Sequence, residues 1–225
     1  MADLPTRAFL FDLDGVLVET RDLVIAGWRR FAATRGRAFT DAQIVERMFG
    51  RRTYDVLVEV LDVSPDEAAA LIAAGLGDKS AEVAAGPPLR EIPGAATFVR
   101  SALAAGIPCA LASSASSINI GLALDSIGLR GAFEVIVDDA RVARGKPAPD
   151  PYLAAARDLG VDPRHCVVFE DTAAGIDAGS AAGARCVGVA TLGRPEMLER
   201  ADLVIEDFSD QTPHGVLRVL EVRRA

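Results

Sequence analysis

The chain has 225 residues, half of them hydrophobic, which suffices for one substantial core with a smaller satellite domain and argues against intrinsic disorder. Its 32 acidic and 24 basic residues give a net charge of −8, which disfavours nucleic acid and anionic membrane surfaces as the main partners. No segment approaches the ~18 uninterrupted apolar residues of a membrane span, and the first residues lack a signal-peptide pattern, so we expect a cytoplasmic protein.

Two carboxylates follow the first apolar run of the chain. Residues Ala8 to Phe11 predict a buried strand, and Gly15 permits a sharp turn directly after it. Asp12 and Asp14 are two residues apart, so both side chains leave an extended backbone on the same side. Because close like charges repel, such a pair needs a nearby cation or a bound proton. The pair therefore indicates a catalytic or metal site.

The next segment lacks strand patterns. Residues 20–85 predict successive amphipathic helices, including one that begins with a capping box from Ser64 to Glu67 and proline at its first position. Residues 86–94 are rich in proline and glycine and predict a linker that returns the chain to the first domain. We therefore expect a helical insert.

Strands and helices alternate after this insert. We predict helices over 95–105, 118–127, 151–159 and 173–182, strands over 108–112, 133–137, 166–169 and 186–189, and an edge strand over 202–205. This alternation indicates an α/β fold with a doubly wound parallel sheet, in which ligands bind at the carboxyl ends of the strands. The three cysteines fall in or beside these strands and have no metal-ligand or disulfide spacing, so we expect reduced core residues at Cys109, Cys166 and Cys186.

Polar residues follow several of the predicted strands. They are Asp12 and Asp14, Ser113 and Ser114, Lys146, and Glu170 and Asp171. Carboxylates without histidine or cysteine suit Mg²⁺ better than Zn²⁺. An ammonium group and a hydroxyl beside that ion can hold a transferring phosphoryl group, so phosphoryl transfer is the leading chemistry.

Each of these residues alone also has a structural explanation. An aspartate after a strand commonly caps a helix or stabilises a turn, and residues 113–117 can form a polar loop that caps the next helix. Lys146 precedes a proline-rich turn, where lysine is usually solvated. The small residues of 174–183 are better explained by close helix packing than by ligand binding. The convergence of several such segments on neighbouring strand ends therefore indicates a site more strongly than any one residue does.

Four of these segments together resemble the haloacid dehalogenase-like hydrolase superfamily, in its phosphatase branch with a helical cap. The matching motifs are Phe11 to Leu17, Leu111 to Ser114, Gly145 to Asp150 and Phe169 to Ile176. The resemblance implies a Rossmann-like parallel sheet core over 1–18 and 90–225 and an inserted small α-helical cap domain over 19–89. It also implies phosphate-ester chemistry, because dehalogenases and phosphonate-cleaving members lack the second aspartate of the first motif.

The same resemblance implies a role for each motif residue. Asp12 would be the nucleophile that becomes an aspartyl-phosphate, and Asp14 the general acid and base. Ser113 and Lys146 would hold the phosphoryl oxygens. Mg²⁺ would be held by Asp12, the backbone carbonyl of Asp14 and Asp171, with Glu170 assisting through water.

The expected substrate is a small phosphorylated metabolite, such as a sugar or polyol phosphate. Candidate substrate-binding residues, besides Ser113 and Lys146, are Ser114, Thr20, Arg51, Arg52 and Lys79. A β-phosphoglucomutase-like mutase is the alternative, although that enzyme's cap histidine and phosphate-binding arginine fall on Val24 and Thr53 here. A non-catalytic phosphometabolite-binding protein is a third hypothesis, and it would require a damaged catalytic set. The oligomeric state stays open, and a monomer fits the sequence.

Overall fold

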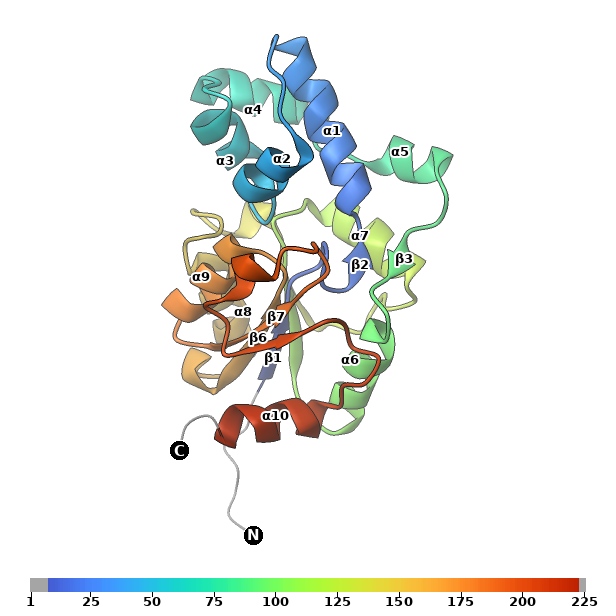
Figure 1. The fold of residues 1–225 in the computed structure, drawn as a ribbon, viewed down its shortest axis with the longest axis vertical. Helices are drawn as coiled ribbons and strands as arrows, with labels where there is room; N and C mark the ends of the chain where they lie inside the picture. Colours follow the sequence, from blue (N-terminus) through green and yellow to red (C-terminus); the bar gives the residue numbers. More distant parts are fainter. Residues whose placement is uncertain (1–7, 223–225) are drawn as a thin grey trace.

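A six-stranded parallel sheet forms the centre of the computed structural model, which describes residues 8–222 (Figure 1). Its strands, all paired in parallel, run in the order β5-β4-β1-β6-β7-β8. They are β1 (Ala8–Phe11), β4 (Cys109–Ala112), β5 (Val135–Val137), β6 (Cys166–Glu170), β7 (Arg185–Val189) and β8 (Leu203–Ile205). The predicted doubly wound, Rossmann-like parallel sheet is confirmed.

Both faces of the sheet are buried, because successive strand residues alternate between two cores. Phe9 and Phe11 enter one core, and Ala8 and Leu10 enter the other. The first core contains residues of α6 (Ala95–Ala104), α7 (Ser117–Ser126) and α10 (Pro213–Val222). The second contains residues of α8 (Asp150–Asp158) and α9 (Ala173–Ala181). Short 3₁₀ turns lie at η2 (Asp139–Arg141), η3 (Pro163–His165) and η4 (Pro195–Leu198).

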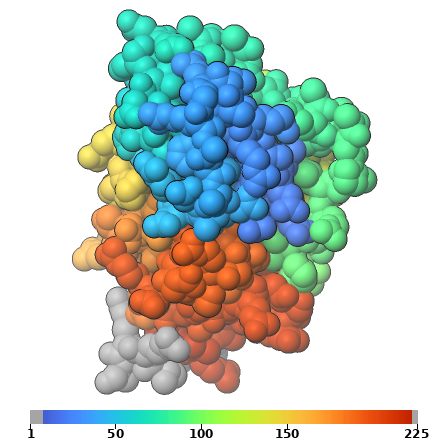
Figure 2. Space-filling model, turned by 45° about the horizontal axis from the view of Figure 1, so that its top comes forward, coloured from blue at the N-terminus to red at the C-terminus, as the bar shows by residue number. Residues whose placement is uncertain are grey.

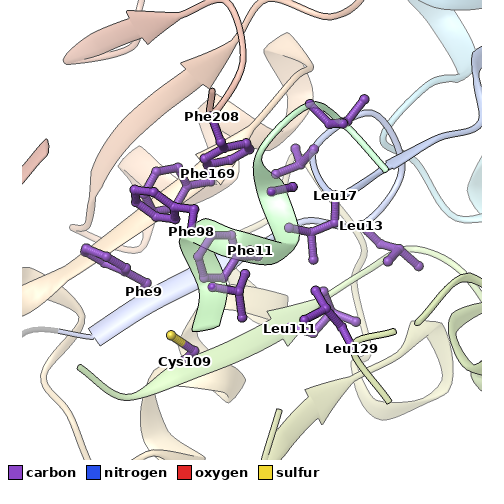
Figure 3. Close-up of a cluster of buried hydrophobic side chains, with 14 of the residues drawn as sticks. Phe9, Phe11, Leu13, Leu17, Phe98, Cys109, Leu111, Leu129, Phe169 and Phe208 are labelled. Atoms are coloured by element: carbon purple, nitrogen blue, oxygen red, sulfur yellow. The ribbon is translucent and has the colours of Figure 1, made fainter. Parts of the chain in front are cut away.

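Phenylalanines dominate the first core beneath the strand ends (Figure 3). The rings of Phe11 and Phe169 stack with centroids 4.7 Å apart, and Phe9 stacks on Phe98 at 5.8 Å. Phe208 packs on Phe98 at 5.0 Å. These aromatic contacts hold β1 and β6 as a rigid base for the residues that follow them.

The helical insert has a hydrophobic core of its own, which contains Ile44, Met48, Val56 and Leu57. The insert comprises α1 (Arg21–Thr34), α2 (Asp41–Met48), α3 (Thr53–Asp55), the π-helical η1 (Val56–Val60), α4 (Pro65–Ala73) and α5 (Ser80–Ala85). In Figure 2 its blue to teal atoms lie above the orange and red C-terminal segments.

A two-stranded antiparallel ribbon connects the insert to the sheet domain. It consists of β2 (Val18–Glu19) and β3 (Arg90–Glu91), where the sequence predicted only a linker. The proposed domain boundaries at 18/19 and 89/90 fall on this ribbon. Such a paired entry and exit restrains both ends of the insert together.

Most predicted elements are confirmed, with two further differences besides this ribbon. The strand predicted over 133–137 begins only at Val135, and α10 was not predicted although Val216 and Leu220 bury one face of it. Ser64 caps α4, since its hydroxyl accepts a hydrogen bond from Glu67 N at 3.3 Å. The Glu67 side chain binds Arg35 at 2.6 Å, so only half of the predicted capping box forms. Within the described chain, no helix is both long and apolar enough to cross a bilayer.

The three cysteines are buried and form no disulfide, as predicted. Burial raises the pKa of each thiol, at Cys109, Cys166 and Cys186, to about 12. They are therefore poor nucleophiles and behave as small apolar core residues.

Candidate active site

The strand order itself creates the site. Strand β1 lies between β4 and β6 in the sheet. The connections on the two sides of β1 run over opposite faces of the sheet, so a crevice opens at the carboxyl ends of these strands. The ladder extends beyond the strands, because Asp12 N donates to Phe169 O at 3.0 Å and Ser113 N donates to Val137 O at 2.9 Å. Three loops that are distant in sequence therefore begin at one place.

Gly15 allows the loop after β1 to lie directly against Asp171. Its φ is +78°, and a Cβ built there would lie 1.9 Å from Oδ2 of Asp171. Any other residue would therefore displace that carboxylate. Thr191, which follows β7, also holds this loop, because its hydroxyl donates to Gly15 O at 2.6 Å.

Lys146 joins two of the carboxylates at the centre of the site. Its Nζ donates to Oδ1 of Asp12 and to Oε1 of Glu170, both at 2.6 Å, and all three side chains are buried. Burial alone would lower the pKa of Lys146, but Asp12 and Glu170 together raise it above its ordinary value. Burial raises the pKa of Asp12 to about 7, against the opposing effect of Lys146.

Glu170 is held by five hydrogen bonds. Besides Lys146, its oxygens accept from Tyr152 OH at 2.8 Å, the hydroxyl of Thr172 at 3.0 Å, and the backbone N of Asp171 and Thr172 at 3.0 and 3.2 Å. A Cβ at Gly175 would lie 1.8 Å from its carboxyl carbon, so that glycine makes room for it. These contacts position Glu170 to fix the loop after β6 and to orient Lys146.

The side chain of Asp171, unlike that of Glu170, has no hydrogen-bond partner. Both of its carboxylate oxygens are buried and have no hydrogen-bond partner. Burial, followed by the nearby Glu170 and Asp12, raises the pKa of Asp171 well above its ordinary value. Ligand oxygens of Asp12, Glu170 and Asp171 lie within 4.8 Å of one another, so a hard cation such as Mg²⁺ fits between them.

A cavity of about 700 Å³ lies between these strand ends and the helical insert. Asp12, Asp14, Asp171, Ser113 and Ser114 all line it. The Ser113 hydroxyl accepts from Ala115 N at 3.1 Å and keeps its proton to donate, whereas that of Ser114 donates to Gly50 O of the insert at 2.9 Å. The structure therefore brings the first, second and fourth motifs to one cavity wall, with Lys146 directly behind Asp12.

The candidate residues of the insert differ in their placement. Lys79 lines the cavity, and its Nζ lies 3.9 Å from Oδ1 of Asp14. Arg51 also lines it but forms an ion pair with Glu59. Thr20 is buried at the start of α1 and borders a separate small hollow beside Asp14.

Arg52 does not line this cavity and instead connects the insert to the segment before Lys146. Its guanidinium binds both oxygens of Asp55, at 2.8 and 2.9 Å, and donates to Val142 O at 2.9 Å and Ala143 O at 3.1 Å. A Cβ at Gly145 would lie 2.6 Å from Nε of Arg52. The glycine before Lys146 thus allows the Arg52–Asp55 pair to pack on this loop.

Two functional positions were missed from the sequence. The pattern places Tyr152 only on a helix, but its hydroxyl reaches Glu170 from α8. Asn119, on α7, donates from its amide to Gly77 O at 2.7 Å and accepts from Lys79 N at 3.0 Å, which fixes the loop that carries Lys79. A polar residue on an otherwise apolar stretch of helix was the available signal in both cases.

The pKa shifts predict how a divalent cation stabilises the protein. A carboxyl whose pKa is raised by folding favours the folded state below its unfolded pKa, and Asp12 loses that contribution as the pH rises from about 4 to about 7. Mg²⁺ competes with these protons, so its binding strengthens over the same range. We expect the Mg²⁺-induced rise in Tm to be larger at pH 8 than at pH 5.

Differential scanning fluorimetry with Mg²⁺ or EDTA measures this effect. Asp171→Asn should abolish the Mg²⁺ response, whereas Asp158→Asn, on the surface of α8, should keep it. Equal Mg²⁺ responses at both pH values, or an unchanged response in Asp171→Asn, would contradict the assignment.

The contacts of Arg52 predict that the insert and the Lys146 loop are coupled. Arg52→Lys keeps the charge but cannot bind Asp55 at two points while donating to two carbonyls. In Gly145→Ala, the added methyl group should push the Arg52–Asp55 pair away from the loop. Both variants should speed amide hydrogen exchange in residues 50–56 and 142–146. The free energy of local opening there should fall by about 1–3 kcal/mol. Arg144→Ala, which removes an exposed arginine paired with Asp150, is the control and should leave 50–56 unchanged.

Comparison with known proteins gives the family. A family model described as haloacid dehalogenase-like hydrolase matches residues 6–183. Hexitol phosphatase A of Escherichia coli is 32% identical over 206 residues, which cover 92% of this chain and 93% of that protein. Beta-phosphoglucomutase of Bacillus subtilis is 32% identical over 213 residues and 92% of both chains.

A solved structure with the same arrangement is a mutant of CbbY from Rhodobacter sphaeroides in complex with xylulose-(1,5)bisphosphate. It has a TM-score of 0.80 and 27% identity, and the match covers 93% of this chain and 98% of that one. Together with the intact motifs at the strand ends, these relatives show that the chain belongs to the haloacid dehalogenase-like hydrolases and is a phosphoric monoester hydrolase.

Proposed function

We propose that this protein is a Mg²⁺-dependent phosphatase that hydrolyses a small phosphorylated metabolite, such as a sugar or polyol phosphate. The observation that carries the proposal is the placement of Asp12, buried beside Lys146 and the two unpartnered oxygens of Asp171, at the floor of a large cavity. Hexitol phosphatase A supports the same substrate class.

Asp12 is the proposed nucleophile. Lys146 binds one carboxylate oxygen, which fixes the side chain so that the other can attack phosphorus. A bond forms between Asp12 and phosphorus as the bond to the leaving alcohol breaks, which gives an aspartyl-phosphate. Water then attacks that phosphorus, releases inorganic phosphate and restores the Asp12 carboxylate.

Asp14 is the proposed proton carrier for both steps. It follows Asp12 by two residues, lines the same cavity, and is partly exposed, with 30% of its side chain accessible. It gives a proton to the leaving alkoxide oxygen and then accepts one from the attacking water. Because Asp14 is partly exposed, it can give and accept these protons, which the buried Asp12 could not do.

The charge on the phosphoryl oxygens must also be offset. We propose that Lys146 and the Ser113 hydroxyl bind these oxygens from two sides. Asp12, the Asp14 carbonyl and Asp171 would hold Mg²⁺, which supplies further positive charge opposite the phosphate. Glu170 acts on this set by orienting Lys146.

A phosphosugar mutase is less well supported. The positions that correspond to a mutase's cap histidine and phosphate-binding arginine, Val24 and Thr53, both line the cavity here. Val24 cannot relay a proton, and Thr53 carries no positive charge for a second phosphate. A binding-only role is disfavoured because every residue of the proposed catalytic set is intact.

Turnover of p-nitrophenyl phosphate tests the proposal. We expect hydrolysis that requires Mg²⁺ and falls by on the order of 10³-fold or more in Asp12→Asn, since removal of a covalent nucleophile costs at least this much elsewhere. Asp158→Asn is the matched control and should keep the wild-type rate. Activity equal to that of Asp12→Asn, across this ester and a panel of phosphorylated metabolites, would refute the phosphatase assignment.

A further inference from the structure

We propose that, among small phosphorylated metabolites, the substrate carries a single phosphate and that its leaving group is an uncharged ring with an apolar face, not an open-chain polyol. This inference rests on the proposed phosphatase function and concerns the part of the cavity away from Asp12. It makes Ile118 and Trp28 specificity-determining residues, one on each side of that cavity.

The size of the cavity exceeds what a phosphoryl group needs. Its volume of about 700 Å³ falls within the range of roughly 300–1,000 Å³ that holds drug-sized ligands. Most of the residues that line it belong to the insert, whereas Asp12 and Asp171 belong to the sheet domain. Either the leaving group or water must therefore fill the rest of the cavity.

Apolar side chains line that space on the side of the insert. Val24, Trp28 and Phe31 come from α1, and Ile72 and Leu76 come from α4 and the turn after it. The rings of Trp28 and Phe31 pack edge to face, with centroids 6.3 Å apart. All five are only partly buried, so each keeps apolar surface that a ligand can cover.

Ile118 provides the apolar surface on the side of the sheet domain. It lies in the first turn of α7 and lines the same cavity. Its 55% exposure exceeds that of the other exposed large hydrophobic residues of the described chain, which range from 38% to 43%. Exposure of this apolar side chain to water is unfavourable unless a ligand covers it. A flat apolar ring between Ile118 and the aromatic residues of α1 would cover it.

The charges of the cavity argue against a second phosphate. Of the lining cations, Arg30 pairs with Glu82 at 2.8 Å and Arg51 pairs with Glu59. Lys79 lies near Asp14, at the reacting end. The acidic residues Asp78 and Asp139 line the cavity as well. A second phosphate dianion would therefore meet balanced or negative charge.

One acyl phosphate and three phosphate esters compare these features. Acetyl phosphate reports the phosphoryl-transfer chemistry alone, and 2-cyclohexylethyl phosphate and sorbitol 6-phosphate are both primary alkyl esters with different leaving-group surfaces. Fructose 1,6-bisphosphate adds the second charge. We expect kcat/KM to be highest for the cyclohexyl ester among the three alkyl substrates, by about tenfold or more, and lowest for the bisphosphate.

Matched variants assign that preference to the cavity. Ile118→Gln should lower kcat/KM for the cyclohexyl ester by about five- to tenfold through KM, and leave acetyl phosphate turnover unchanged. Leu103→Gln alters another exposed apolar residue, on α6 and outside the cavity, and should change neither. Trp28→Leu should repeat the selective effect, with Phe39→Leu, whose side chain packs in the same insert but does not line the cavity, as its control.

The outcomes separate this inference from the function on which it rests. Turnover of acetyl phosphate with a preference for sorbitol 6-phosphate or the bisphosphate would overturn the inference and leave the phosphatase standing. Equal losses on all esters in Ile118→Gln would also overturn it. No turnover of any of the four compounds, acetyl phosphate included, would overturn the phosphatase function and the inference with it.

Discussion

The ammonium of Lys146 between two buried carboxylates is the interaction on which the rest of the site depends. Asp12, Glu170 and Asp171 crowd within 4.8 Å, and burial penalises each charge. Lys146 offsets one of three negative charges, so two remain, which protons or one divalent cation must neutralise. The unpartnered oxygens of Asp171 are the atoms at which we propose that a divalent cation binds.

The fold creates this concentration of charge and also limits it. Stacked phenylalanines beneath β1 and β6 fix the two strand ends, and the sheet order brings the loops after β1, β4 and β6 together. Gly15 and Gly175 then let the backbone pass so close to Asp171 and Glu170 that no other side chain fits. The insert lies over these strand ends, and its Arg52 donates hydrogen bonds to Val142 O and Ala143 O in the segment before Lys146.

Much of the fold and the centre of the site could be predicted from the sequence. Strand runs, alternation with helices and the residues after each strand are local signals, and they correctly placed Asp12, Ser113 and Asp171 at one edge. The rest depends on contacts between distant residues. No local pattern shows that Arg52 turns away from the cavity to reach Val142, that Tyr152 donates to Glu170, or that β2 pairs with β3. Likewise, an exposed Ile118 gains meaning only when the insert is seen opposite it.

Rapid-quench mass spectrometry of Asp14→Asn tests the central claim most directly. The variant keeps the proposed nucleophile but lacks the group that activates water, and p-nitrophenolate leaves without needing a proton. Mixing with p-nitrophenyl phosphate and Mg²⁺ should therefore accumulate protein heavier by one phosphoryl group. Peptide mapping should place that group on Asp12, and Asp12→Asn in the same background should abolish it. If product forms while no quench time yields phosphorylated protein, Asp12 is not the nucleophile and the account given for Lys146 fails.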